Sequence, residues 1–570
     1  MNLRTVLSLL PACALSIFVT GSPVHAQSSA LMDTMSAELH RAMSMLGKGG
    51  DGQLQPYYMS YSAHEVYAVD ITAEQGGLVA SEANHARLVN IVLRIGDPRL
   101  DNTHGEHRAS AISTFPLPMG DDRRAIARSL WWSTNQLYGN ALQTYLQVKT
   151  ETQVRAKEED TSPDFSSEQP QTSVAADPVD APAVDRQQWE GRTRALSAVF
   201  RQYPHVYSNF VEMSVQNQTN YFVSSEGSRL LFPHQLARVV IFASTRADDG
   251  MDLFRAQTFE AQTAAELPSQ QEMEADVRKL AASLEDLRTA PVTQPFDGPA
   301  LLSGRAAAVF FHEVLGHRLE GQRQRGDEEG QTFTKEVGKP ILPDFLSVAD
   351  DPTLATFDGT YLSGYYTYDD EGQRAQKVDL IQQGVLKTFL MSRLPIASFA
   401  DSNGHGRAQI GLMPTGRQGN LIVTSSRTVP ESELRKMLID EVKKQGKPYG
   451  LYFDDISSGF AVTQRSSPQA FSVIPLVVYR VYADGRPDEL VRGVSIVGTP
   501  QAALKKIIAT GDKRDVFNGE CGAESGTIPV SAVAPAMLVS EIETQRQQQG
   551  TARPPLLPPP TATVEKAVKQ

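Results

Sequence analysis

Apolar residues recur at helical spacing in three stretches of the first half of the chain. Residues 29–46 place leucine and methionine on one face and predict an amphipathic helix. A longer stretch, 124–157, follows the acidic pair Asp121-Asp122, a composition typical of a helix N-terminus. Residues 269–290 predict a third helix, because Ser269 and Glu272 stand three positions apart in the pattern of a capping box.

Polar and apolar residues alternate between these helices, which predicts strands. The alternation runs through residues 57–95, where Gly76-Gly77 and Gly96-Asp97-Pro98 act as turn signals. We expect further strands in this half at residues 206–215, 220–223 and 236–244.

The second half begins near Val292 and contains more strand-like runs than helical ones. We expect strands at residues 307–311, 385–390, 421–424, 472–481 and 493–497, and helices at 431–445 and 500–509. These patterns together predict an α+β fold with mixed or antiparallel sheets. We expect an N-terminal domain at residues 29–290 and a β-rich C-terminal domain at residues 292–545.

The first 26 residues are typical of a secretory signal peptide. Arg4 precedes a mostly apolar run at residues 6–19, and Val24-His25-Ala26 resembles a cleavage site, so that the mature chain begins at Gln27. A lipoprotein signal at Cys13 is disfavoured because this cysteine lies inside the apolar run. No other stretch is long and apolar enough to span a bilayer. We therefore expect an exported protein, periplasmic or extracellular.

Two further segments differ from the rest in composition. Residues 158–184 are rich in Pro, Ser, Asp and Glu, which predicts either a solvated loop or an extended strap. Residues 546–570 contain a run of prolines and predict a disordered tail.

Overall composition narrows the function. Apolar residues make up 41% and charged residues 21%, which suffices for a packed core. The net charge of −12 disfavours a protein that binds nucleic acid, because the phosphate backbone would repel it. Signal cleavage removes Cys13 and leaves Cys521 as the single thiol, which cannot form an internal disulfide. Such a thiol in an oxidising compartment is expected to be buried or bound to a metal.

The residues with metal-binding chemistry gather in one short segment. His312, Glu313 and His317 belong to His-Glu-Val-Leu-Gly-His, in which two imidazoles can hold zinc while the carboxylate acts on a water molecule. The usual spacing of four leaves two histidines about 40° apart around a helix, whereas the spacing of five leaves them about 140° apart. We therefore expect either a widened π-type turn or a distortion near Gly316. Two histidines that meet no metal are the alternative for the motif alone.

This segment resembles the TldD/PmbA family of metalloproteases, also called modulators of DNA gyrase. The resemblance includes HEVLGHRLEG at 312–321 and is strongest over residues 302–542. The other matching segments are YDDEG at 368–372, VDLIQQGVLKTFL at 378–390, MPTGRQGN at 413–420, VRG at 491–493, CG at 521–522, IPV at 528–530 and, more loosely, NYFVSSEG at 220–227.

The resemblance implies that His312, His317 and Cys521 are zinc ligands and that Glu313 is the catalytic carboxylate. Two imidazoles and one thiolate leave a fourth position for water, as in catalytic zinc sites. Family members are paired subunits, which implies a homodimer or a heterodimer with a paralogous subunit. Peptide substrates would be short or unfolded and would bind as an added β-strand. The signal peptide and the acidic insert depart from cytoplasmic members, and an exported protein cannot meet gyrase.

The predicted function is therefore a zinc-dependent metallopeptidase that hydrolyses peptides, with Glu313 as the general base. The alternative is a non-catalytic scaffold that binds a catalytic partner in a paired complex. Because the chain keeps all three implied ligands, the catalytic reading is preferred.

Other polar residues are weaker candidates. Glu320, three residues after His317, either orients a ligand imidazole or is a solvated or capping residue. His405 either donates to a reaction intermediate or is an exposed loop histidine.

The remaining candidates are expected to have no part in catalysis. Arg492 predicts a structural ion pair. An acidic turn at residues 369–371 is expected to be solvated. His104 and His107 imitate a metal site, but a third ligand is missing from their loop, so we expect an ordinary loop there.

Overall fold

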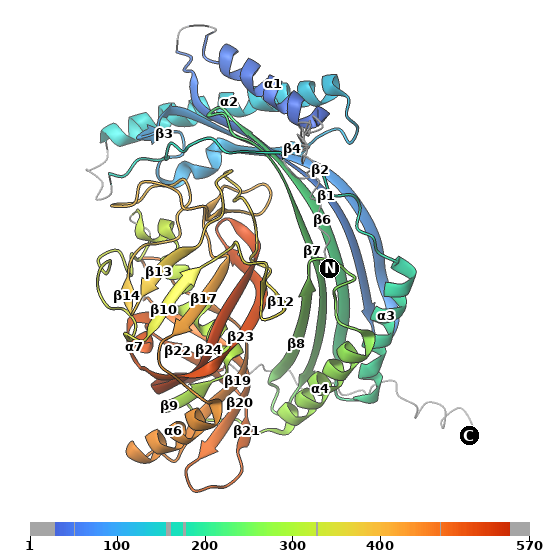
Figure 1. Cartoon of the computed structure of the whole chain (residues 1–570), viewed down its shortest axis with the longest axis vertical. Coiled ribbons are helices and arrows are strands. Elements are labelled where there is room, and N and C mark those ends of the chain that lie inside the picture. Colours follow the sequence, from blue (N-terminus) through green and yellow to red (C-terminus); the bar gives the residue numbers. More distant parts are fainter. Residues whose placement is uncertain are drawn as a thin grey trace, which may run out of the picture.

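The computed structural model describes residues 29–48, 50, 52–154, 161–174, 178–326, 329–467 and 469–547. The predicted signal peptide, and the predicted tail from residue 548 onward, lie outside the described residues. Within the described part, no helix is both long and apolar enough to cross a membrane. Two large sheets and the helices around them form the α+β fold that the sequence predicts (Figure 1).

The N-terminal sheet has eight strands in the order β3-β2-β1-β6-β7-β5, with β4 beside β2 and β8 beside β7. Its long antiparallel hairpin turns at Gln75 and Gly76, which both adopt positive φ angles. The strands are β1 (Pro56–Glu74), β2 (Gly77–Asp97), β3 (Leu100–Asp101), β4 (Ile112–Pro116), β5 (Thr172–Ser173), β6 (Ser208–Ser224), β7 (Arg229–Arg246) and β8 (Asp252–Ala261).

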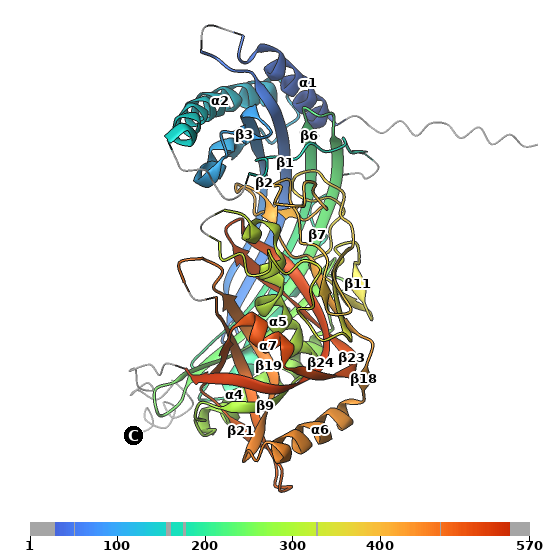
Figure 2. The same cartoon turned by 90° about the vertical axis from the view of Figure 1, so that its left-hand side faces the viewer.

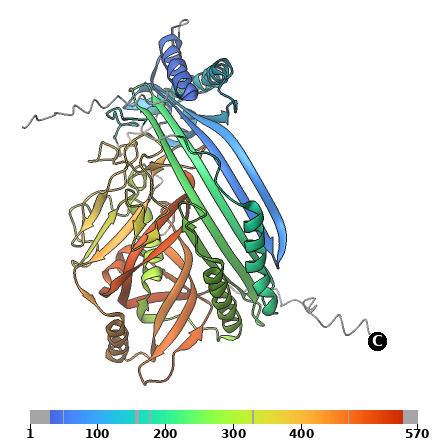
Figure 3. The same cartoon turned by 45° about the vertical axis from the view of Figure 1, so that its right-hand side comes forward.

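Side-chain alternation gives this sheet two different faces. On β1, Tyr61 and Ile71 are buried in apolar clusters with the four helices, whereas Ser62 and His64 point to the opposite face. The C-terminal domain lies on that opposite face (Figures 1 and 3). The covering helices are α1 (Ala30–Met45), α2 (Arg123–Val154), α3 (Arg186–Ala198) and α4 (Gln270–Thr289). The predicted capping box of α4 is present at Ser269 and Glu272.

The C-terminal sheet has twelve strands, five of which close into a ring. β24 pairs with β22 and β9, β22 pairs with β20, and β19 joins β20 to β9. The longer strands are β9 (Asp297–Leu302), β10 (Leu346–Asp350), β13 (Val378–Gln382), β17 (Asn420–Ser425), β19 (Tyr449–Ala461), β20 (Phe471–Tyr482), β22 (Val494–Gly498), β23 (Ile507–Ala523) and β24 (Gly526–Arg546). The shorter strands of this sheet are β14 (Val385–Leu386), β18 (Thr428–Val429) and β21 (Glu489–Val491). Two separate two-stranded sheets are formed by β11 (Thr356–Phe357) with β12 (Thr360–Tyr361) and by β15 (Gly406–Arg407) with β16 (Thr415–Gly416).

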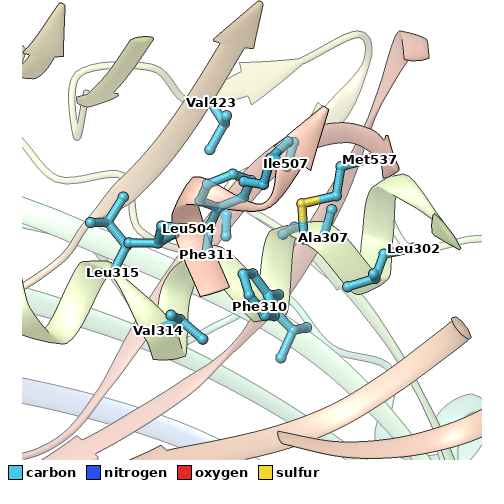
Figure 4. Close-up of a cluster of buried hydrophobic side chains, with 14 of the residues drawn as sticks. Leu302, Ala307, Phe310, Phe311, Val314, Leu315, Val423, Leu504, Ile507 and Met537 are labelled. Atoms are coloured by element: carbon cyan, nitrogen blue, oxygen red, sulfur yellow. The ribbon is translucent and has the colours of Figure 1, made fainter. Parts of the chain in front are cut away.

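The predicted strand at 307–311 is wrong, because these residues belong to helix α5 (Gly304–Val314). The helix packs against β24, β19, β20 and β9 of the ring, and against β23 (Figure 2). Apart from Arg305 all its residues are buried, and Phe310 and Phe311 pack near Ile507 and Met537 (Figure 4). A helix that is buried all round has a continuous apolar run rather than a stripe, and such a run is ambiguous in sequence.

Helix α5 ends between His312 and His317, where the spacing of these two histidines predicted a distortion. Leu315 caps the helix, and a 3-10 helix, η3 (Gly316–Leu319), continues the chain. The buried Arg318 donates to the carbonyls of Glu313 and Val314 at this end, and to those of Val462 and Ala470 beside the β19–β20 connection. Of the two expected solutions, the structure therefore adopts the distortion near Gly316.

The remaining predicted elements are partly correct. Helix α6 (Glu431–Lys444) lies where it was expected, but α7 (Pro500–Lys505) is shorter, because β23 begins at Ile507. Only Val385 and Leu386 of the run 385–390 form a strand. The boundary between the two predicted domains stays a prediction.

The described part of the acidic insert, residues 161–174 and 178–184, follows the extended alternative. We call residues 161–174 the strap. Its Phe165 and Asp164 are buried, and Ser166 donates a backbone hydrogen bond to the carbonyl of Arg393 in the C-terminal domain. Residues 164–166 are thus packed against the rest of the protein, whereas the other described residues of the insert are exposed or half-buried.

Shortening the buried side chain of Phe310 tests whether the packing of α5 stabilises the C-terminal domain. Phe310 packs against Phe311 and Phe471, so Phe310→Ala should lower the free energy of unfolding by about 3–5 kcal/mol. Phe460→Ala, at a phenylalanine that is 56% exposed, is the matched control and should cost about 0.5 kcal/mol or less. Urea unfolding followed by far-UV circular dichroism measures both. Equal losses in the two variants would contradict this role of α5.

Candidate metal centre

Three segments far apart in sequence bring the predicted ligands together. His312 is in the last turn of α5, His317 is in η3, and Cys521 is near the end of β23. Their ligand atoms all lie within 4.8 Å of one another, and Sγ of Cys521 is 3.5 Å from Nε2 of His317. All three residues are buried. Within the described part of the chain, this is the one group of three such residues whose ligand atoms converge.

The three side chains strongly shift one another's pKa values. Burial alone would raise the pKa of the Cys521 thiol, but His317 and His312 outweigh burial and hold this pKa well below its usual value. Burial alone would lower the pKa of His317, but Cys521 and Glu320 outweigh it and raise this pKa well above its usual value. The arrangement therefore favours a thiolate, the form of cysteine that binds metals.

The donor set fits a zinc ion. Nδ1 of His312 is buried and has no hydrogen-bond partner among the described residues, although a buried polar nitrogen normally has one. Two imidazoles and a thiolate are ligands that zinc prefers, and three protein ligands leave one coordination position for water or substrate. The roles of His312, His317 and Cys521 as ligands stay a prediction.

Glu313 lies beside the ligand cluster and is held by the backbone of β19. Its Oε1 accepts a hydrogen bond of 3.0 Å from the Gly459 N–H, and its Oε2 is 3.8 Å from Nε2 of His317. A Cβ atom at Gly459 would lie 2.8 Å from Cγ of Glu313, so only glycine leaves room for this side chain. We did not predict Gly459 from the sequence, although a glycine inside a strand often marks a close approach.

Glu320 is fully buried, so its predicted solvated alternative is wrong. Nδ1 of His317 donates to Oε1 of Glu320 at 3.2 Å, which leaves Nε2 as the free nitrogen beside Cys521. Burial alone would raise the pKa of Glu320, but His317, Arg323 and Arg417 lower it to about 2. The carboxylate is therefore charged and can orient the imidazole.

Arg417 and Gln418 complete the surroundings of the cluster, and the sequence patterns did not reveal them. The buried Arg417 donates to the carbonyl of Cys521 at 2.7 Å, and its Nε is 3.5 Å from Oε1 of Glu320. Gln418 packs so closely at the end of α5 that a Cβ atom on Gly316 would lie 1.9 Å from its Oε1. Both residues lie in the glycine-containing segment 413–420, so the resemblance was the available signal.

His405 is neither exposed nor part of the ligand cluster. It is fully buried, with Nε2 at 3.3 Å from Oδ1 of Asp350 and Nδ1 at 3.0 Å from the carbonyl of Asn403. The exposed-loop alternative is therefore wrong, and these contacts give His405 a structural explanation. Its part in catalysis stays a prediction without support from this geometry.

The acidic turn at 369–371 was expected to be solvated, and this is wrong for Asp369, whereas Asp370 and Glu371 are half-buried. Asp369 is 2% exposed and accepts hydrogen bonds from the backbone of Glu371, Gln373 and Gly406. Glu371 accepts one from the backbone of Arg393. Sequence alone did not show which backbone N–H groups would fold over these carboxylates.

The other weak candidates are structural. Arg492 forms the expected ion pair, at 3.0 Å from Asp249. His104 pairs with Asp164 at 2.9 Å, and His107 lies 3.2 Å from Glu151. Because the two histidines contact different carboxylates, the described residues around them form no second group of three ligands.

The segment that contains the ligand cluster matches a known protein family. Residues 296–546 match the family model described as the PmbA/TldA metallopeptidase C-terminal domain. This segment is therefore similar to the C-terminal domain of the TldD/PmbA family. This segment contains the complete ligand cluster together with Glu313, Glu320 and Arg417.

Curated relatives that are named metalloproteases match at low identity. A protein from Methanothermobacter thermautotrophicus, named a metalloprotease, is 26% identical over 63% of this chain and 73% of its own length. A zinc metalloprotease TldD homolog from Saccharolobus solfataricus is 24% identical over 43% of this chain and 51% of its own length. Apart from the Methanothermobacter protein, the chain spans about half the length of these curated relatives.

The fold also matches solved TldD/PmbA structures. TldE from Thermococcus kodakarensis superposes with a TM-score of 0.57 at 10% identity, covering 90% of this chain and all of that one. At this identity the likeness concerns the fold alone. It supports the two-sheet α+β architecture with a β-rich C-terminal region.

The cluster predicts that zinc retention depends on Cys521. Cys521→Ala removes the only anionic ligand and should weaken zinc binding by more than about 100-fold while leaving the protein soluble. Metal analysis after dialysis against a chelator measures retention. His40→Ala, at an exposed histidine of α1, is the control and should keep full metal content. Full zinc occupancy in Cys521→Ala would contradict the assignment and direct the search for a third ligand to the carboxylates.

Proposed function

We propose that this protein is a zinc-dependent metallopeptidase that hydrolyses short or unfolded peptides. The observation that carries the proposal is the convergence of His312, His317 and Cys521 beside the carboxylate of Glu313. The names of the curated relatives, metalloprotease and zinc metalloprotease, support it. A scaffold that had lost the activity would have no need to keep all four side chains in one buried cluster.

Different residues of the chain have different roles in peptide hydrolysis. Bound by His312, His317 and Cys521, zinc would supply a Lewis acid that polarises the peptide carbonyl and lowers the pKa of water. Glu313 accepts the proton from the attacking water and returns it to the leaving amine. The Gly459 N–H holds one oxygen of Glu313 in place, while the other stays near the ligand atoms.

Glu320 and Arg417 position this machinery without touching the reacting atoms. Glu320 fixes the orientation of His317 through Nδ1, and Arg417 fixes the backbone of Cys521. Because Arg417 also lies beside Glu320, one buried guanidinium connects the two ligand-bearing segments.

Export to the periplasm or the outside of the cell is part of the proposal. It rests on the signal-peptide pattern of residues 1–26, with cleavage before Gln27. The alternative function, a non-catalytic partner in a paired complex, is favoured if the purified mature protein binds no metal.

Glu313→Gln tests the role of the general base. The amide keeps the shape of the side chain but cannot accept a proton, so hydrolysis should fall by about 10²–10⁴-fold with zinc still bound. Cleavage of a mixed peptide pool, with and without chelator, gives the rates. Glu431→Gln, at an exposed glutamate of α6, is the matched control and should keep the wild-type rate. Near-normal hydrolysis by zinc-loaded Glu313→Gln would reject Glu313 as the base.

We also propose that the protein acts as a dimer, with itself or with a paralogous chain. Helix α2 supports this, because Trp131, Trp132 and Leu146 are between 38% and 55% exposed on it. Trp132→Glu should shift the protein toward monomer in light scattering, because it places a charge on this apolar surface. Lys149→Glu on the same helix is the control. An active wild-type enzyme that is strictly monomeric would remove the idea.

A further inference from the structure

A large cavity of about 620 Å³ lies between the N-terminal sheet and the C-terminal domain. Its first wall is the sheet face that the helices leave free, formed by alternate residues of β1, β2, β6 and β7 together with β4. Its second wall comes from the acidic turn, the loop at 407–414 and the β23–β24 hairpin. The cavity is large enough for several residues of a peptide.

The cavity adjoins the metal centre. Ile528 lines the cavity, stands opposite Cys521 in the β23–β24 pairing, and shares a small buried cluster with it. A ligand in the cavity is therefore separated from the metal-binding thiol by a single layer of side chains. The cavity therefore lies close enough to the cluster to hold part of the same substrate.

The sheet wall carries hydrogen-bonding groups without charge. Ser62, Gln218 and Asn220 contribute hydroxyl and amide groups. The wall also contains two histidines: burial lowers the pKa of His64, and burial together with Arg407 lowers the pKa of His234 to about 4. Both imidazoles are therefore neutral near pH 7, and this wall offers no cation.

Most charged groups on the second wall are already paired. Arg407 donates to the carbonyls of Gln418 and Pro529 at 2.9 and 3.0 Å, and its guanidinium stacks on Tyr366. Glu520 forms an ion pair with Arg238. The carboxylate of Asp369 is occupied by backbone N–H groups.

Asp370 is the exception. Its Oδ2 accepts a hydrogen bond of 2.8 Å from the Ala408 N–H, but its Oδ1 has no hydrogen-bond or ion-pair partner among the described residues. Burial raises the pKa of this carboxyl group, and the Ala408 N–H and the nearby Arg407 offset this effect only in part. A charged group at the edge of a confined cavity is stabilised when a ligand of opposite charge fills the space.

We propose that this cavity binds a cationic nitrogen of the peptide substrate and that Asp370 is its counter-ion. The nitrogen is a primary ammonium, either the α-amino group of the peptide or a lysine side chain. This inference rests on the proposed peptidase function and adds a substrate preference to it. The neutral amides of β6 and the imidazoles of His64 on β1 and His234 on β7 accept the remaining hydrogen bonds of the ammonium group.

Peptide chemistry tests the preference without altering the protein. In the first series, each peptide is tested with a free N-terminus and with an acetylated N-terminus. In the second series, every peptide is acetylated, and each position around the scissile bond carries either Lys or Gln. If the α-amino group binds, acetylation should lower kcat/KM by about tenfold or more. If a lysine side chain binds, replacing Lys by Gln at one position should have that effect. Equal rates throughout both series would overturn the inference.

A pair of variants assigns the preference to Asp370. Asp370→Asn should reduce kcat/KM for the cationic peptide by about tenfold, to the value for its neutral counterpart, mainly through KM. Asp379→Asn, at an exposed aspartate of β13 outside the cavity, is the control and should keep the wild-type ratio. Wild-type discrimination in a correctly folded Asp370→Asn protein would overturn the role of Asp370.

A binding measurement separates this inference from the proposed function. The same peptides are titrated calorimetrically into the zinc-loaded Glu313→Gln protein, where turnover does not interfere. Binding about tenfold tighter for the cationic peptide supports the inference even if hydrolysis fails, in which case only the peptidase function is wrong. Equal binding alongside zinc-dependent hydrolysis by the wild type overturns the inference and leaves the function intact.

Discussion

The structure of the C-terminal domain depends on the burial of helix α5 on nearly all its sides. Strands β9, β19, β20 and β24 surround the helix, so its position, rotation and end point are fixed by packing. The last turn therefore delivers His312 and Glu313 to one defined place. Because Arg318 satisfies the free carbonyls there, the chain can leave the helix at once and return with His317.

Buried charged side chains then fix the positions of His317 and Cys521, which the packing of α5 does not determine. Glu320 and Arg417 connect the end of α5 to the strand that carries Cys521, although 204 residues separate Cys521 from His317. Each member of this network has its charge compensated by a neighbour, which makes removal of one member costly for the others. Such a network would hold the three predicted ligands in place before an ion arrives, which would lower the entropic cost of binding it.

Sequence patterns predicted local features well and long-range ones poorly. The capping box at Ser269 and the helix at 29–46 depend on neighbouring residues and were correct. The run 307–311 was assigned to a strand, because a fully buried helix loses the periodicity that distinguishes it. The burial of His405 and Asp369 depends on contacts with distant loops, which one sequence does not display. The ligand cluster could be predicted mainly because the motif of His312 and His317 is local and Cys521 is one of two cysteines in the sequence.

The free face of the N-terminal sheet has an evolutionary consequence. Its alternating side chains on β1 and β6 line the cavity, whereas the ligand-bearing residues and their supports all come from the C-terminal domain. A substitution on this face leaves the ring around α5 untouched, so selection can change what the protein recognises while the reactive residues remain constant. The two halves of the chain can therefore diverge at different speeds, and sequence similarity concentrated in residues 296–546 is what such a division of labour produces.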